Sequence, residues 1–559
     1  MTYDPEPRYP VAGGEVQSGY EVLASEVARR RPGVLAVDGP AALPWEQVIG
    51  SLDTALRASG VRARTLDVRA SLAPWDEIQR RTAAAELPGD PVFARTFDGS
   101  LSELFDGLPS ARTAADEVAL VFGPGSALID HDVLWYADVP KRLELEAVQR
   151  GRAGNVGQAP GEPGSERRLA FVDWPMLDRH KQELAGRLDR YIDLSTSDAP
   201  RSVAGDALRR SLAALAVRPF RTRPTFLPGP WGGQWLRRML GVETDAPNLA
   251  WSYELITPES GILLGDSEPA EVGFELLMSE HASRVLGAEV AKSFGQSFPI
   301  RFDYLDTLDG GHLSIQCHPS ETYMRETFGL PYTQHETYYV MVTTPGAKIF
   351  LGLREDADLG AFEADAELAE QPGEAFEPEH YLQTHPAEQH RLYLIPAGTP
   401  HASGAGNVVL EISATPYLYT LRFYDWLRRD LEGGLRPVHL RHAFSNLDLR
   451  RRGESVRELM REPSVVRHGS GWRELALGRS PELFFAVHRL DFDDEITDHT
   501  GGRFHVLNLA AGDEIEVQTA EAVHPLSYAE TIVIPAAAGD YRLRRVRGGP
   551  CKVVKAFVR

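Results

Sequence analysis

The sequence has very few cysteines and no long apolar run. Cys317 and Cys551 are the only cysteines in 559 residues, too few for a disulfide framework, so a reducing environment is expected. No apolar stretch approaches the length that crosses a bilayer. The N-terminal segment MTYDPEPRYPVAGGEV has neither the basic start nor the apolar core of a secretory signal. These absences predict a cytoplasmic protein with no membrane association.

Basic residues are also in deficit. Lys and Arg number 59 against 80 Asp and Glu, which gives a formal net charge of −21. This excess repels nucleic acid and anionic membranes, so neither is expected as a partner. A phosphorylated substrate would need a local basic pocket. Hydrophobic residues at 43% and charged residues at 25% are typical of a globular protein, and the length allows several domains.

The first part of the chain alternates strand-like and helix-like segments. Short apolar runs end in Gly- or Pro-marked turns, and a helical stretch separates the first two. This pattern predicts an α/β domain with a parallel sheet over residues 1–215. The strand-like runs are GVLAVDGP (33–40), ARTLDV (63–68), EVALVFGPGSAL (117–128) and RLAFVDWPML (168–177), and the helical stretch is WEQVIGSLDTALRASG (45–60).

The turn after the first strand-like run resembles the phosphate-binding loop of nucleoside-kinase-like proteins. A working loop ends in Gly-Lys-Ser/Thr, whose lysine contacts the β- and γ-phosphates and whose hydroxyl binds magnesium. Here Pro44, Trp45 and Glu46 stand at these places. An indole replaces the lysine and a carboxylate repels phosphate, so we predict a degenerate P-loop-like turn without ATP turnover. A structural or ligand-sensing role follows.

From residue 216 the chain is rich in short β-type runs separated by turns. Such spacing predicts an antiparallel sandwich or barrel. A helical insertion is expected around residues 421–462, followed by a second β-rich stretch. The predicted domains are therefore 216–435 and 436–559. The β-type runs include ELITPESGILLG, HLSIQCHP, ETYYVMV, AKIFLGL, RLYLIPAG and NVVLEISA.

Three segments carry candidate metal ligands. Gln316 and His318 in LSIQCHPSETYM are two residues apart, so on a strand they point to the same face. Glu336 begins the run ETYYVM, and His401 follows the Pro-x-Gly turn of LIPAGTPHASGAGN. Two imidazoles, a carboxylate and an amide oxygen suit zinc or a similar divalent ion, with a position left for water or substrate. One His among 17 is weak evidence, but the ordered set predicts a metal site.

These segments, with PGPWGGQW, WSYEL and LRFYDW, resemble the type I mannose-6-phosphate isomerase family of the cupin superfamily. The resemblance spans residues 217–559 and implies a bicupin of jelly-roll barrels: a metal-binding barrel, then a helical segment and a metal-free cupin-like lobe. In that lobe Asp540 stands where the first barrel has His401. By position, the resemblance implies Gln316, His318, Glu336 and His401 as ligands of one Zn²⁺ per chain, and Arg422 as the active-site arginine.

The resemblance implies a metal-dependent aldose–ketose isomerase acting on a phosphorylated hexose, most directly mannose 6-phosphate to fructose 6-phosphate. Arg422 would stabilise a developing oxyanion or grip the phosphate of this small-molecule substrate. The catalytic base stays open between Glu411, His335 and His312.

One departure from the family keeps an alternative function open. The family commonly has a lysine two residues before the metal-binding glutamate, and here Gln334 takes that place. A non-catalytic sugar-phosphate sensor is therefore a second hypothesis. Metal-dependent oxygenation is a third, disfavoured by the Gln-His-Glu-His set and Arg422.

Overall fold

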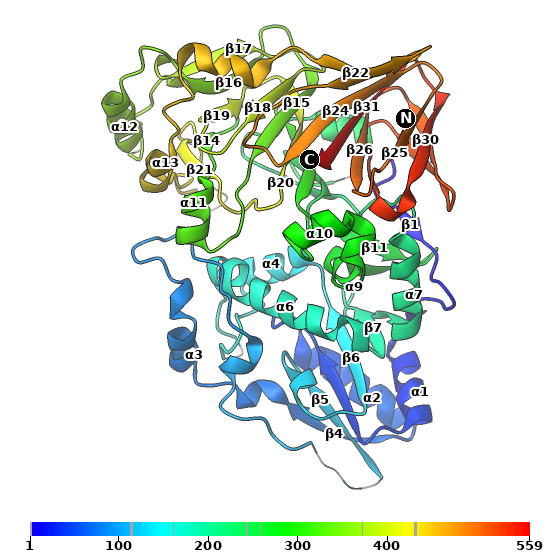
Figure 1. Ribbon diagram of the computed structural model, residues 1–559. Coiled ribbons are helices and arrows are strands. Elements are labelled where there is room, and N and C mark those ends of the chain that lie inside the picture. The colour runs from blue at the N-terminus through cyan, green and yellow to red at the C-terminus, as the bar shows by residue number, and fades with distance from the viewer. Residues whose placement is uncertain are drawn as a thin grey trace. The chain divides into compact units, whose positions relative to one another are not determined.

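The computed structural model describes residues 3–559 except 112, 113, 115, 160, 242, 243, 258, 372 and 430–432. The chain divides into two compact units (Figure 1). The α/β unit consists of Pro7–Leu215 and Gly261–His281, and the β unit consists of the residues up to Glu6, Ala216–Ser260 and Ala282–Arg559. The multidomain, β-rich organisation agrees with the sequence analysis. The packing of Gly261–His281 with the α/β unit was not predicted from the sequence.

A seven-stranded sheet forms the centre of the α/β unit, in the order β2-β8-β7-β6-β3-β5-β4. The five strands from β7 to β4 are parallel, whereas β8 pairs antiparallel with β7 and β2 pairs antiparallel with β8 at one edge. Central strands such as β3 are almost continuously apolar because both faces are covered. The strands are β2 (Gln17–Ser18), β3 (Val34–Asp38), β4 (Arg62–Asp67), β5 (Glu117–Phe122), β6 (Val133–Asp138), β7 (Arg190–Asp193) and β8 (Arg201–Ala204).

Helices α1 and α2 cover one face of this sheet (Figure 1). Leu23 of α1 and Leu52 of α2 pack in one core with Leu35 and Trp135 of the strands. The i, i+3, i+4 spacing of apolar residues places them on the buried side of each helix. The helices of this unit are α1 (Tyr20–Arg30), α2 (Trp45–Ala58), α3 (Trp75–Arg81), α4 (Lys141–Gln149), α5 (Glu166–Arg168), α6 (Trp174–Leu184), α7 (Gly205–Leu215) and the first part of α9 (Phe274–Leu286).

The segment Gly261–His281 completes the α/β unit through a second, small sheet and buried ion pairs. Strand β11 (Gly261–Leu264) pairs with β1 (Arg8–Tyr9) and with β12 (Ala270–Gly273). Glu275 accepts from the Lys181 ammonium at 2.6 Å, and the same ammonium donates to Asp138 at 2.8 Å. Because an unpaired buried charge is costly, Lys181 depends on both carboxylates.

The predicted strand RLAFVDWPML is wrong, because this stretch is helical. Residues Leu169–Asp173 form a π-helical segment, η5, between α5 and α6. Pro175 lies in the first turn of α6, directly after the π-helical segment. Short apolar runs do not distinguish a strand from a buried helix, and Leu169, Val172 and Met176 follow helical spacing.

The first part of the β unit contains two antiparallel sheets that carry the candidate site. One has the order β18-β15-β20-β13-β10-β9 and the other β17-β16-β19-β14-β21. The first contains β9 (Thr225–Leu227), β10 (Trp251–Leu255), β13 (Ile300–Asp306), β15 (Glu336–Thr343), β18 (Leu392–Ile395) and β20 (Asn407–Ala414). The second contains β14 (Ile315–Cys317), β16 (Lys348–Leu353), β17 (Leu382–Pro386), β19 (His401–Ser403) and β21 (Leu421–Tyr424).

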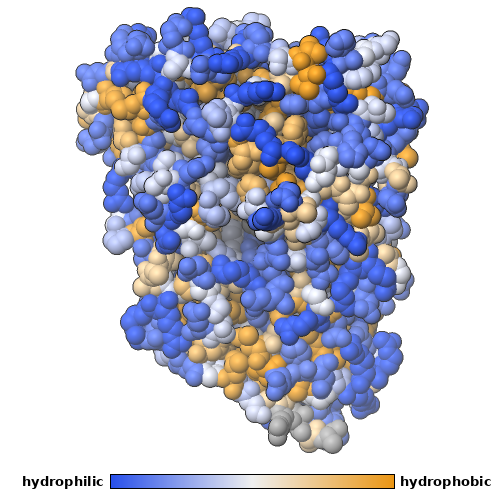
Figure 2. Space-filling view, viewed as in Figure 1, coloured by the Kyte–Doolittle hydropathy of each residue, from blue (hydrophilic) through white to orange (hydrophobic). Residues whose placement is uncertain are grey.

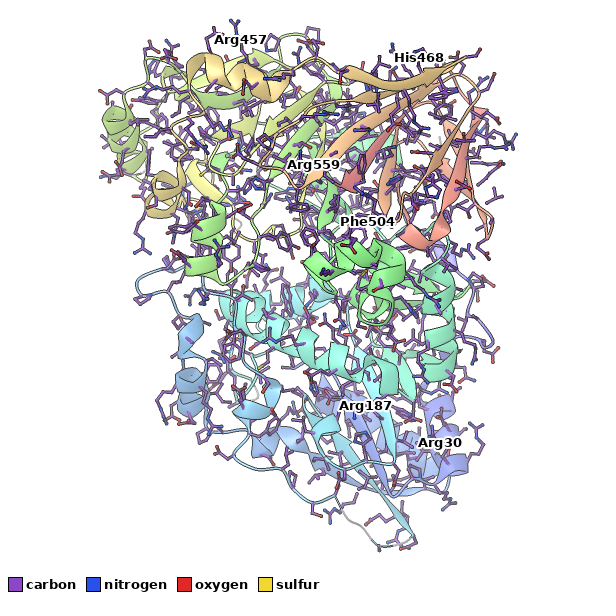
Figure 3. All side chains as sticks on the ribbon, in the orientation of Figure 1. Arg30, Arg187, Arg457, His468, Phe504 and Arg559 are labelled. Carbon is purple, nitrogen blue, oxygen red and sulfur yellow. The ribbon has the colours of Figure 1, made fainter. Side chains whose placement is uncertain are left out.

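The C-terminal lobe of the β unit also has two sheets, in the orders β22-β23-β24-β31-β26-β29 and β25-β30-β27-β28. Leu490, Leu507, Ile515 and Leu543 belong to its apolar core. At the edge strand β22, His468 is exposed on the surface, as is Arg457 of a preceding helical turn (Figure 3). The strands are β22 (Ser464–Gly469), β23 (Trp472–Ala476), β24 (Phe485–Phe492), β25 (Glu495–His499), β26 (His505–Ala511), β27 (Glu514–Gln518), β28 (Val523–Ser527), β29 (Thr531–Ile534), β30 (Asp540–Arg547) and β31 (Cys551–Val558).

The helical insertion expected over 421–462 is only partly helical. Its first residues form strand β21, and residues 430–432 lie outside the described chain. A short helix α13 (Leu440–Asn446) and a 3-10 segment η9 (Gly453–Met460) follow. The other helices of the β unit are α8 (Trp235–Leu240), α10 (Ala288–Phe294), α11 (Glu321–Tyr323) and α12 (Leu359–Leu368).

Hydrophilic residues predominate on the face of the protein seen in Figure 2, with apolar residues in small groups. Within the described residues, no helix has the length and apolar character needed to cross a membrane.

Candidate metal centre

The four predicted ligands lie on, or directly after, strands of both sheets of the first lobe. Gln316 lies in β14 and His401 begins β19, and the two residues are paired across these strands. His318 follows β14 directly, and Glu336 begins β15 of the other sheet. Paired residues of antiparallel strands project to the same face, so Gln316 and His401 are neighbours.

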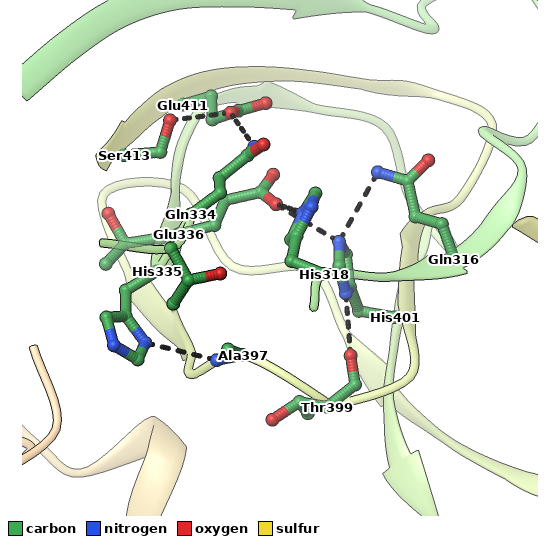
Figure 4. A network of polar contacts seen from close by, with 12 residues as sticks. Gln316, His318, Gln334, His335, Glu336, Ala397, Thr399, His401, Glu411 and Ser413 are labelled. Carbon is green, nitrogen blue, oxygen red and sulfur yellow. Dashed lines mark hydrogen bonds and ion pairs between the residues drawn. The ribbon is translucent and has the colours of Figure 1, made fainter. Parts of the chain in front are cut away.

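His318, Glu336 and His401 converge on one buried point (Figure 4). One donor atom from each lies within 4.8 Å of the others, and all three side chains are buried. The Nε2 atoms of both histidines face the same oxygen of Glu336: His318 is hydrogen-bonded to Oε2, and His401 lies 3.2 Å from it. This arrangement matches the two-imidazole, one-carboxylate part of the predicted set.

The tautomer of His401 is fixed by its neighbour. Nδ1 lies 2.9 Å from the carbonyl oxygen of Thr399, which can only accept, so Nδ1 carries the proton. The lone pair of a neutral His401 then sits on Nε2 and faces the carboxylate of Glu336. Two lone pairs at 3.2 Å require a cation between them, either a proton or a metal ion.

Further observations favour a metal ion at this point. Oε1 of Glu336 is buried and has no hydrogen-bond partner among the described residues. Burial lowers the pKa of His318, which keeps its imidazole neutral as a metal ligand requires. The donor set of imidazole nitrogens and a carboxylate oxygen suits a borderline divalent ion such as zinc. The residues therefore fit the implied metal.

Gln316 lies beside the cluster with its amide nitrogen directed toward it. Nε2 is 3.4 Å from Nε2 of His401, while Oε1 accepts from the hydroxyl of Ser314 at 2.9 Å. A half-turn of the amide would present the oxygen to the cluster, and the Ser314 hydroxyl would then accept from Nε2. Gln316 thus stands at the predicted place but is not oriented as an oxygen ligand.

A row of buried charged residues extends from Glu336 across the six-stranded sheet. Asp303 of β13 and Tyr338 of β15 both pair with Glu411 of β20, so their side chains share one face with Glu336. Arg301 lies on the same face of β13. Its guanidinium forms an ion pair with the Glu411 carboxylate and lies 3.7 Å from the carboxylate of Asp303. Arg301 and Asp303 were not among the residues predicted from the sequence.

Burial perturbs both carboxyls of this row. It raises the pKa of Asp303 to about 7 and raises that of Glu411 well above its usual range, although Arg301 opposes both shifts. If Glu336, Asp303 and Glu411 are all ionised, their three negative charges outnumber the single positive charge of Arg301 by two. A divalent ion would balance this excess.

Gln334 contacts Arg301. Its amide is best satisfied with the oxygen accepting from Arg301 at 2.8 Å and the nitrogen donating to the Pro416 carbonyl at 2.9 Å. In the opposite orientation Nε2 donates to Glu411 at 3.3 Å (Figure 4). Gln334 therefore lies against a cation supplied by β13, which is separated from β15 by β20 in the sheet.

Arg422 of β21 pairs with Gln316 of β14, which places it beside the cluster. Its guanidinium donates to the Pro437 carbonyl at 2.9 Å and contacts His439. Burial lowers the pKa of Arg422 to about 10, so the side chain stays charged at neutral pH. The contacts described for Arg422 do not include the three clustered ligands.

The three candidates for the catalytic base lie in different places. His335 precedes Glu336 on the chain and points away from the cluster, where its Nδ1 accepts from the backbone of Ala397 at 3.1 Å (Figure 4). His312 accepts from the backbone of Ala405. Glu411 alone of the three lies on the face of Glu336. In the C-terminal lobe, Asp540 belongs to no group of three metal-ligating side chains within the described chain.

Known proteins are similar to parts of this chain. Residues 19–217 match a family model described as a domain of unknown function (DUF8485). The chain is 26% identical to mannose-6-phosphate isomerase of Streptococcus mutans over 224 residues, which cover 39% of this chain and 64% of that protein. It is 22% identical to mannose-6-phosphate isomerase ManA of Bacillus subtilis over 331 residues, which cover 59% of this chain and 96% of that protein.

A solved structure shares the fold. The crystal structure of mannose 6-phosphate isomerase from Bacillus subtilis superposes with a TM-score of 0.50 and 20% identity, covering 61% of this chain and 99% of that one. The chain therefore contains the fold of that structure, in addition to a region that matches a family of unknown function.

Proposed function

We propose that the β unit is a metal-dependent isomerase of phosphorylated hexoses, with mannose 6-phosphate and fructose 6-phosphate as its substrate pair. The convergence of His318, Glu336 and His401 on one buried point carries this proposal. Similarity to two mannose-6-phosphate isomerases and the fold of a solved one support it.

The two histidines and Glu336 would hold the ion, with Gln316 as a fourth ligand after rotation of its amide. A bound divalent ion would polarise the carbonyl and hydroxyl oxygens of the sugar. Thr399 holds His401 in the required tautomer.

Aldose–ketose interconversion moves a proton between C1 and C2 through an enediolate. Of the three candidate bases, Glu411 is the one that faces the cluster, and its raised pKa lets a carboxyl carry a proton at neutral pH. Arg301 balances its charge when the proton leaves. Arg422 projects beside Gln316 and would bind the phosphate or the enediolate through paired N–H donors.

A coupled assay that follows fructose 6-phosphate tests the proposal, with the metal content measured on the same sample. His401→Ala should lose both metal and turnover, because one of the three clustered donors is removed. His468→Ala, an exposed histidine in the other lobe, is the matched control and should keep both. Full metal content in His401→Ala would remove this residue from the ligand set.

The non-catalytic sensor remains a second candidate because Gln334 replaces a lysine and Arg301 is already paired with Glu411. If the protein is a sensor, calorimetry should detect binding of mannose 6-phosphate to the metal-loaded protein, and no product should form. Turnover that disappears on chelation and returns with added Zn²⁺ would rule it out.

A further inference from the structure

The α/β unit contains a cavity of about 460 Å³ that the isomerase reaction does not use. Its walls come from the segments that follow β3, β4 and β5, and from the chain after α4. Glu46, Asp67, Arg69, Trp75 and Pro124 are among the lining residues. The volume lies in the range of small-molecule sites.

The position of the cavity in the sheet is that of a ligand site. Strands β3, β4 and β5 are parallel and adjacent in the order β3-β5-β4, so their carboxyl ends meet at one edge. The chain leaves β3 toward β4 on one side, and later passes from β5 to β6 on the other side of β3. In open α/β sheets, ligands bind outside the carboxyl ends of strands at such a reversal.

The same edge is not built for phosphate. Trp45, at the place of the P-loop lysine, is fully buried in the core, and its Nε1 donates to the Pro40 carbonyl at 3.0 Å. Glu46 places a carboxylate in the first turn of α2, where a phosphate would otherwise meet the helix dipole. Arg69 donates to Glu46 at 2.6 Å and to Asp67 at 2.8 Å, so its charge is already balanced.

The lining instead combines hydrogen-bonding groups with an apolar wall. Asp67 and Glu46 offer carboxylate lone pairs beside the N–H groups of Arg69, an arrangement that suits adjacent hydroxyls. Leu72 and Trp75 also line the cavity and contribute apolar surface. Arg168 lies 4.7 Å from the centre of the Trp75 ring and holds the indole in place.

We propose that this cavity binds an uncharged ring compound with adjacent hydroxyl groups. The hydroxyls would bond to Asp67, Glu46 and Arg69, and the ring would pack on Trp75. Free monosaccharides and nucleosides share this chemistry. The site is separate from the metal centre and does not depend on the isomerase proposal.

Titration calorimetry on the full chain tests this inference. The probes are D-glucose and D-mannose for sugars, adenosine and uridine for nucleosides, and ATP and inorganic phosphate as charged comparisons. Ala70 is exposed and lines the cavity, so Ala70→Trp fills it. Ala58, exposed at the end of α2 and outside the cavity, gives the matched control Ala58→Trp.

We expect binding of at least one sugar or nucleoside, which identifies the source, and weak or no binding of the phosphates. Ala70→Trp should abolish binding, and Ala58→Trp should leave it unchanged. Asp67→Asn should weaken binding about 10- to 100-fold, because a charge-assisted hydrogen bond becomes a neutral one. Glu46→Gln, whose side chain is 69% exposed, gives a second variant with little risk to folding and should also weaken binding.

Three results would overturn the inference. The first is no binding of any uncharged probe at millimolar concentration. The second is unchanged binding by a folded Ala70→Trp or by Glu46→Gln. The third is tighter binding of ATP or phosphate than of every uncharged probe.

Discussion

At the scale of single residues, the candidate site depends on contacts that fix side chains before any substrate arrives. The Thr399 carbonyl sets the tautomer of His401, and the strand pairing of Gln316 with His401 sets their common direction. Neither contact involves an unusual residue type. The candidate site is therefore defined more by the placement of the backbone than by the residue types alone.

Arg422 gives a prediction at this scale. Arg422→Lys keeps the charge but loses the planar pair of donors, so turnover should fall about 30- to 1000-fold. The metal content and melting temperature of the variant should equal those of the unmodified protein. Both are measured on the same preparation as turnover. Arg450→Lys, at a side chain that is 76% exposed, is the control. A lower melting temperature with normal turnover would instead show that Arg422 has a structural role, through its hydrogen bond to the Pro437 carbonyl.

At the scale of elements, the sequence predicted the strands of the candidate site well. Gln316, His318 and Glu336 belong to short strand-like runs whose two-residue period decides which side chains enter the interior. The same period in IRFDYLD places Arg301 and Asp303 on one face, and that alternation could have revealed them. The alternation alone did not identify Arg301 and Asp303, because the sequence does not show that this face of the strand is buried.

Two features could not be predicted from local pattern. RLAFVDWPML satisfies both helical and strand spacing over its short length, and only its packing decides for the helix. The assignment of Gly261–His281 to the α/β unit rests on contacts between segments distant in the chain, such as Lys181 with Glu275. Local sequence does not encode such pairings.

The start of α2 gives a prediction at the element scale. Trp45 is a core residue and not a nucleotide contact, so Trp45→Ala should destabilise the α/β unit by about 3–5 kcal/mol in chemical denaturation. Magnesium-dependent ATP hydrolysis should be absent from the unmodified protein. Hydrolysis that persists through purification and is lost in Arg69→Ala would contradict this interpretation of the turn.

At the scale of the whole molecule, buried carboxyls make stability depend on pH. Burial raises the pKa of Glu144 in the α/β unit to about 8. Because its protonated form is favoured in the fold, stability is full below the ordinary carboxyl pKa and falls as the pH rises toward 8. By pH 7 the loss is on the order of 3 kcal/mol.

Glu144→Gln should therefore flatten the dependence of the α/β unit's unfolding free energy on pH between 5 and 8. The amide stays neutral throughout this range. Glu146→Gln, at a partly exposed side chain on the same helix, should not alter the slope. An unchanged slope in Glu144→Gln would show that this carboxyl ionises as easily in the folded chain as in the unfolded one.

The two-segment composition of the α/β unit gives the last prediction. A fragment of residues 7–215 lacks β11, β12 and Glu275, so Lys181 would lose one of its two buried carboxylates. We expect this fragment to be poorly folded, as judged by circular dichroism and thermal unfolding. The same fragment joined to residues 261–281 by a flexible linker should fold cooperatively. Equal stability of the two would show that the second segment is dispensable.

This two-segment composition also bears on how the protein is made. A nascent chain emerges from the ribosome N-terminus first, and domains generally fold as complete units. Here the α/β unit cannot close its small sheet or pair Lys181 with Glu275 until residues 261–281 have been synthesised. Part of the β unit, Ala216–Ser260, emerges before that point. The α/β unit can therefore be completed only after the Ala216–Ser260 segment of the β unit has been synthesised, and it passes through a stage in which all but its last 21 residues are present.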